Sequence, residues 1–80
     1  MTLAWFIYTS LFLQPGESVR MPLALPNSFL MAVAAPPNYT QDPPALRLVV
    51  ACGQRYEALT GLTREQMVLT AARWYQECQS

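Results

Sequence analysis

The chain has 80 residues, of which 52% are apolar or aromatic and only 12% are charged, and its five arginines balance five acidic residues. A soluble domain has roughly 25% charged residues, and a chain of this length makes one small domain with a thin core. The absence of a basic excess argues against a nucleic-acid-coating protein and a peripheral membrane protein. The surplus of apolar residues predicts a subunit that lies against protein partners.

The first segment, residues 2–13, is uncharged and rich in β-branched and aromatic side chains, which favours a β-strand. Such a strand would be apolar on both faces, and because the chain is too small to cover both, a second layer is expected from another molecule. The segment is shorter than the roughly 20 apolar residues of a transmembrane helix and lacks the basic start of a signal peptide. We therefore expect no membrane span, and a location in a cytoplasmic assembly or a virion rather than secretion.

The next segment, residues 14–25, has the pattern of a turn followed by a strand. Pro15 and Gly16 fit the two central positions of a type II turn, because Pro presets the first φ and Gly supplies the second, positive one. Residues 18–25 then alternate between apolar and other side chains, which predicts a return strand. Pro22 lacks an N–H group, so this strand should be an edge strand or contain a bulge. Sheet edges are places where other chains can add on.

A third apolar run follows at residues 29–35, and it is too short for its periodicity to distinguish a strand from a helix. We predict a third short strand in preference to a two-turn helix capped by Asn27. Residues 36–44 contain four prolines, which predict a stiff, extended connector.

The C-terminal part, residues 45–80, has the pattern of two helices. Asp42 followed by two prolines predicts a helix start, and Gly61 predicts its end. Thr63 and Gln66 are spaced as a capping box for a second helix. The apolar stripe of the first predicted helix consists of Ala45, Leu48, Val49, Cys52, Tyr56 and Leu59.

Together these segments predict a single α+β domain over residues 1–80. Its β part, residues 1–35, would form a small antiparallel sheet of two or three strands at about 2–34. The proline-rich connector at 36–44 would lead to an α-helical hairpin with helices at about 43–60 and 64–78, packed on one face of the sheet.

The two cysteines, Cys52 and Cys78, bear on the redox state of the chain. In an antiparallel helical hairpin centred on Gly61 they would be about six residues out of step, or about 9 Å at 1.5 Å per residue. That offset exceeds the usual Cα separation of a disulfide, so we expect both to be reduced and partly buried. Because the chain has no histidine, they do not complete a zinc site within one chain.

The sequence lacks the residue patterns of an enzyme. It has no histidine and one aspartate, its cysteines lack C-x-x-C spacing, and its three glycines are too dispersed for a phosphate-binding loop. We therefore expect no catalytic residues, no cofactor and no metal. Residues 56–67 loosely resemble a helix-turn-helix, with Gly61 at the turn, but no basic cluster supports phosphate contacts and a capped hairpin explains the same pattern.

Aromatic side chains cluster near both ends of the chain. Trp, Tyr, Met and Arg are enriched where proteins meet, and a small core does not hold all of them. The predicted function is a non-enzymatic structural or interaction subunit of a larger protein assembly, such as a virus or phage particle. The alternatives are a small inhibitor or adaptor that docks on one partner, and a helix-turn-helix-like DNA-binding regulator. The predicted interface residues are Trp5, Phe6, Tyr8, Phe12, Arg20, Met21, Trp74 and Tyr75.

Overall fold

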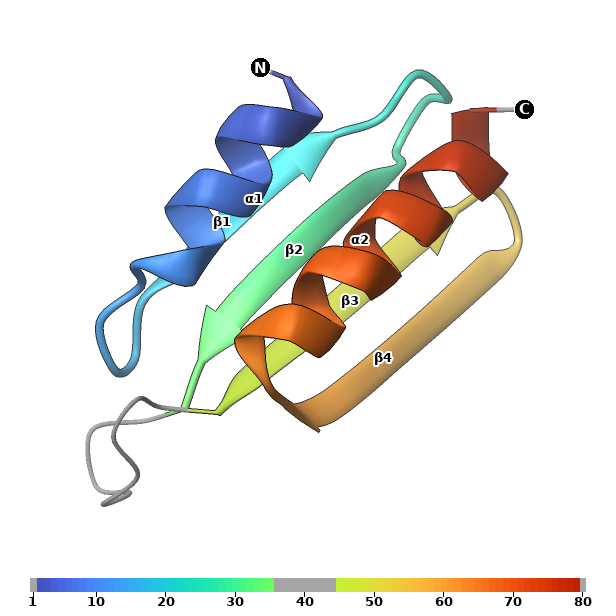
Figure 1. Cartoon of the computed structure of the whole chain (residues 1–80). Helices are drawn as coiled ribbons and strands as arrows, with labels where there is room; N and C mark the ends of the chain where they lie inside the picture. The colour runs from blue at the N-terminus through green and yellow to red at the C-terminus, as the bar shows by residue number, and fades with distance from the viewer. Residues whose placement is uncertain (1, 36–44, 80) are drawn as a thin grey trace.

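The computed structural model describes residues 2–35 and 45–79, which form a four-stranded antiparallel sheet with two helices on one of its faces (Figure 1). The strands lie side by side in the order in which they follow in the sequence. The predicted α+β class is confirmed, although the sheet draws strands from both halves of the chain. In chain order the elements are α1 (Leu3–Leu11), β1 (Ser18–Pro22), β2 (Phe29–Ala34), β3 (Leu46–Cys52), β4 (Arg55–Leu62) and α2 (Arg64–Gln79).

The predicted strand over residues 2–13 is wrong, because this segment forms the helix α1. Its N-cap is Thr2, whose hydroxyl accepts a hydrogen bond from the backbone N–H of Trp5 at 3.2 Å. Phe6 and Ser10 lie four residues apart on the inner side of the helix and are fully buried. The Ser10 hydroxyl donates to the Phe6 carbonyl at 2.7 Å, so burial leaves it paired. The apolar residues of this segment are compatible with a strand and with a helix. The helix forms because it buries one side of the segment, the side of Phe6 and Ser10, against the sheet.

The prediction for the next segment is confirmed in outline. The Glu17 N–H donates to the Gln14 carbonyl at 2.9 Å and Gly16 has a φ of 86°, as a type II turn requires. β1 pairs with β2 and lies at the edge of the sheet, with Pro22 as its last residue. The strand preferred for residues 29–35 is β2.

The predicted helix at about 43–60 is wrong, because this part of the chain forms the hairpin of β3 and β4. The strands are joined by Gly53 and Gln54, and Gly53 has a φ of 61°, which suits the first central position of a type II′ turn. Gly61, predicted to end the helix, lies in β4 with a φ of 69°, next to an irregularity in the pairing with β3. The helix-turn-helix prediction is therefore also wrong, because its first helix is a strand. The predicted connector at 36–44 lies outside the described residues.

The second predicted helix, at 64–78, is confirmed as α2 together with its capping box. The Gln66 N–H donates to the Thr63 hydroxyl at 3.2 Å, and the Thr63 N–H donates to the Gln66 side-chain oxygen at 3.0 Å. The Arg64 guanidinium donates to the carbonyl of Leu11 at 2.9 Å. This bond places a cation at the C-terminal end of α1 and links the two helices.

The hydrophobic core lies between the sheet and the two helices. α1 packs on β1 and α2 packs mainly on β3, while the two helices also contact each other. Trp74 of α2 and Phe6 of α1 are the largest side chains of this layer, and both are at most 2% exposed. The other core residues are Leu13, Met21, Leu30, Ala32, Ala34, Leu46, Leu48, Val50, Met67 and Ala71.

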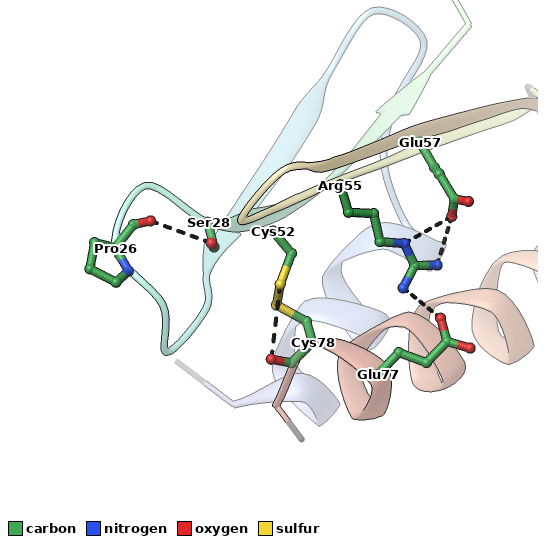
Figure 2. The surroundings of a disulfide bond; sticks show 7 residues. All are labelled: Pro26, Ser28, Cys52, Arg55, Glu57, Glu77 and Cys78. Atoms are coloured by element: carbon green, nitrogen blue, oxygen red, sulfur yellow. Dashed lines mark hydrogen bonds and ion pairs between the residues drawn. A yellow bond between two sulfur atoms is a disulfide. The ribbon is translucent and has the colours of Figure 1, made fainter.

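The prediction of two reduced cysteines is wrong, because Cys52 and Cys78 form a disulfide with a Cα separation of 6.1 Å (Figure 2). The reason is the length of the two elements between them. The eight residues of β4 run back about 26 Å and the sixteen residues of α2 return about 24 Å, so α2 ends beside the hairpin where β3 ended. The disulfide therefore fastens the helix layer to the sheet.

Candidate protein interaction surfaces

The face of the sheet that points away from α1 and α2 is covered by no element among the described residues, and we call it the open face (Figure 1). Alternation along β2 shows how it is built. Leu30, Ala32 and Ala34 are buried beneath the helices, whereas the residues between them are half-buried on the other side. The strand register assigns the open face to Ser18, Arg20, Pro22, Phe29, Met31, Val33, Arg47, Val49, Ala51, Tyr56 and Ala58.

The centre of the open face is apolar and close-packed. Val49 is only 2% exposed, although it lies on the opposite side of the sheet from the core cluster. Its partners in the neighbouring strands are Met31 and Ala58. Because no described helix or strand covers this side, the burial of Val49 marks a dry centre within the sheet surface. The half-buried Phe29 and Val33 continue the apolar surface around it.

The charges of the open face are all positive among the described residues. Arg20 lies at its β1 side and Arg47 at its end nearest the start of β3, and both are exposed. The Arg20 guanidinium carbon lies 4.7 Å from the centre of the Phe29 ring, which is a cation–π distance.

The described carboxylates lie elsewhere. Glu57 and Glu77 bind Arg55 at 2.7 and 2.6 Å on the helix side of the sheet, as Figure 2 shows. Arg55 donates hydrogen bonds to Glu57 and to Glu77, and these bonds, that with Glu57 first, raise the pKa of Arg55, so this arginine stays charged. Glu17 accepts a bond from the turn at Gln14. The two arginines of the open face are therefore not neutralised by a carboxylate of the described chain.

A hollow of about 480 Å³ continues the open face at the β1–β2 hairpin. Its walls are Arg20, Pro22, Phe29 and the loop residues 23–28. Asn27 at the tip of this loop has a φ of 60°, and the Leu23 N–H donates to the Ser28 carbonyl at 2.9 Å. The hollow is thus formed by a closed loop beside the cation–π pair.

The outer side of α1 carries a second apolar surface, which we call the aromatic stripe. It consists of Trp5, Tyr8 and Phe12, whose exposed fractions are 48%, 67% and 63%. Their spacing of three and four residues places them on one side of the helix, opposite the buried Phe6 and Ser10. The Tyr8 and Phe12 rings lie 5.0 Å apart.

The predicted interface residues separate into two groups. Phe6, Met21 and Trp74 are core residues that are at most 2% exposed, and Tyr75 is half-buried against the core. The exposed group consists of Trp5, Tyr8, Phe12 and Arg20.

Sequence reasoning missed most of the open face. Met31, Val33, Val49 and Tyr56 were not singled out as interface residues. The available signal was that β2 has apolar residues at every position, which is typical of a strand in contact on both faces.

The described residues contain no group of three or more His, Cys, Asp or Glu side chains placed to hold a metal ion. Within residues 2–35 and 45–79, neither helix is long and apolar enough to cross a membrane. In comparisons with models of protein families, with curated proteins and with solved structures, the chain matches none of them.

Proposed function

We propose that this protein is a non-enzymatic interaction subunit of a larger protein assembly and that it works through apolar contacts. The observation that carries this proposal is the open face, where a dry apolar centre around Val49 has no covering element in the described chain. The largest apolar patch on a monomeric protein is typically about 300–600 Å² and is often a site where other molecules bind.

The size of the open face indicates how strong one such contact is. Four strands at about 4.8 Å spacing and about five residues at 3.3 Å make a patch of roughly 300 Å². At about 25 cal/mol per Å² of apolar accessible surface, covering it contributes at most roughly 7 kcal/mol before the cost of association, which is itself about 4–15 kcal/mol. One patch alone therefore gives weak binding, and stable attachment needs several contacts at once.

The aromatic stripe supplies a second contact in a different direction. The stripe lies on the side of α1 opposite the buried Phe6 and Ser10. Because α1 lies on the face of the sheet opposite the open face (Figure 1), the two surfaces lie on opposite sides of the molecule. A chain with two such surfaces touches two neighbours, which favours an assembly subunit over an inhibitor that docks on one partner. A virus or phage particle is one kind of assembly that would cover both surfaces.

The disulfide bears on the redox environment in which the protein acts. Disulfides persist in oxidising environments and are rare where glutathione keeps thiols reduced. We therefore favour an extracellular, periplasmic or particle-surface setting over the cytoplasm.

Sedimentation velocity of the disulfide-bonded chain across the micromolar range tests the proposal. We expect weak, concentration-dependent self-association, because the isolated chain has apolar surfaces and no net charge to keep copies apart. Tyr8→Gln in the aromatic stripe and Met31→Thr in the open face should each weaken it.

Leu69→Gln is the matched control, since Leu69 of α2 is 65% exposed but lies outside both surfaces. It should leave the association unchanged. A single sedimenting species of monomer mass at every concentration would contradict the proposed function.

A further inference from the structure

We propose that the open face binds one amphipathic helix of a partner protein, with the apolar side of that helix on β2 and β3 and carboxylates on its flanks beside Arg20 and Arg47. This inference rests on the proposed function and names the partner chemistry of one of its two surfaces. It follows from the size of the face, from its charges and from the way in which the chain covers the opposite face.

The size of the open face matches a helix. The footprint of this face, roughly 300 Å² from strand spacing and residue rise, is about four strands wide and five residues long. A helix of about twelve residues is about 18 Å long and about 10–12 Å wide, so it occupies most of the patch. On the covered side, the same sheet already binds two helices, through contacts of α1 with β1 and of α2 with β3 and β4.

The charges determine which kind of helix fits. Arg20 and Arg47 border the apolar centre on two sides, and no described carboxylate neutralises either of them. On β2, Met31 pairs with Arg20 and Val33 pairs with Arg47, so a helix that crosses β2 at these two residues lies between two cations. Carboxylates on the flanks of that helix complete the exposed ion pairs, which set orientation and partner choice more than affinity.

A second copy of this chain fits the open face less well. Two open faces packed together would bring like charges of both copies to one interface. The α1 helix of another copy has aromatic side chains on its outer side but no charged residue, so it offers the arginines no carboxylate. Single-stranded nucleic acid would need more cations than these two to neutralise its phosphates.

The test uses the full, disulfide-bonded chain labelled with ¹⁵N and a synthetic amphipathic peptide of about 15 residues, a length at which an isolated helix is marginally stable. The peptide has leucines on one face and glutamates on both flanks, and a matched peptide has lysine in place of every glutamate. We expect the glutamate peptide to shift the amide resonances of β2, β3 and β4 and to bind more tightly than the lysine peptide.

Charge reversal supplies the decisive comparison. Arg20→Glu and Arg47→Glu should each weaken binding of the glutamate peptide about fivefold, and the double variant should prefer the lysine peptide. Arg73→Glu is the control of equal charge change, because Arg73 has a side chain that is 64% exposed on α2, away from the open face. It should leave both affinities within about twofold.

Three results would overturn the inference. One is equal binding of the two peptides, another is a set of resonance shifts confined to α1 and α2, and the third is tight binding of a thymidine oligonucleotide that displaces the glutamate peptide. If the glutamate peptide fails to bind while Met31→Thr still weakens self-association, the inference falls and the proposed function stands. If the chain is also monomeric at every concentration, both fall.

Discussion

The helix-covered face and the open face are built by alternate residues of the same four strands, and the pair Val49 and Val50 shows how they differ. Val50 is fully buried beneath the helix layer and belongs to the core cluster. Val49, one residue earlier, is 2% exposed on the side that no described element covers. Both faces are thus apolar at their centres, but only one is covered by the chain itself. Burial within a sheet and membership of the core are therefore separate properties.

What fastens the covered face is the set of links between the helices and the rest of the chain. The disulfide holds the end of α2 to the end of β3, and Arg55 joins Glu77 of α2 from β4 at 2.6 Å. At the other end of α2, Arg64 bonds to the Leu11 carbonyl. The described residues supply no such links for the open face, so substitutions on the two faces should have different effects on folding.

The largest expected effect comes from removing the disulfide in the double variant Cys52→Ala and Cys78→Ala. The bond joins residues that are 26 positions apart, and closing a loop of that length in the unfolded chain corresponds to about 3.5 kcal/mol of the free energy of unfolding. Urea unfolding of the double variant and of the oxidised parent checks this. The opposite result, an unchanged unfolding midpoint, would mean that the two layers hold together without the covalent link.

A smaller loss of stability compares the two faces of the sheet directly, through the matched variants Val50→Ala and Val49→Ala. Each removes two methyl groups, worth about 1.6 kcal/mol in transfer free energy. Val50→Ala also leaves a cavity beneath α2, so we expect a total loss of about 2–3 kcal/mol. Val49→Ala opens toward solvent and should cost about 1 kcal/mol, because neighbouring side chains can move into the space. Equal losses in denaturant unfolding would show that the open face is as enclosed as the core.

The smallest of these effects concerns the start of the helix that covers β3. Thr63→Ala removes the hydroxyl that accepts from the Gln66 N–H, and loss of such a cap typically costs about 1 kcal/mol. The expected change in the free energy of unfolding is therefore about one third of that for the disulfide. Thr63→Ser keeps a hydroxyl and serves as the control, with an expected loss below about 0.5 kcal/mol. A serine variant as unstable as the alanine variant would show that the hydroxyl is not what matters.

Local chemistry was enough to predict several elements from the sequence. The turn at Pro15 and Gly16 and the capping box of Thr63 and Gln66 are set by neighbouring residues, so their geometry does not depend on the rest of the fold. The edge position of β1 follows from the missing N–H of Pro22 in the same way. Of the aromatic residues predicted for an interface in the first segment, Trp5, Tyr8 and Phe12 are exposed and Phe6 is buried, and all four belong to α1 or its end rather than to a strand.

The prediction failed where apolar residues fit more than one period. In β3 and β4, the positions of Leu48, Cys52 and Leu59 match a helical stripe, but the chain reverses at Gly53 and pairs the two halves as strands. The Gly53–Gln54 dipeptide between apolar runs was the local signal of a hairpin. The error carried over to the cysteines, because an offset calculated for two helices does not apply to a strand followed by a helix.

By itself, the sequence determined the turns, the helix cap of α2, the edge position of Pro22 and an excess of apolar surface over what a small core can bury. These properties depend on residues close together in the chain or on composition alone. The tertiary structure decided that residues 3–11 are a helix, that β3 and β4 complete the sheet, and that Cys52 meets Cys78. It also decided which apolar residues form the open face. In a strand that is apolar on both sides, the sequence does not show which side faces the core, and the packing of the helices on one side decides this.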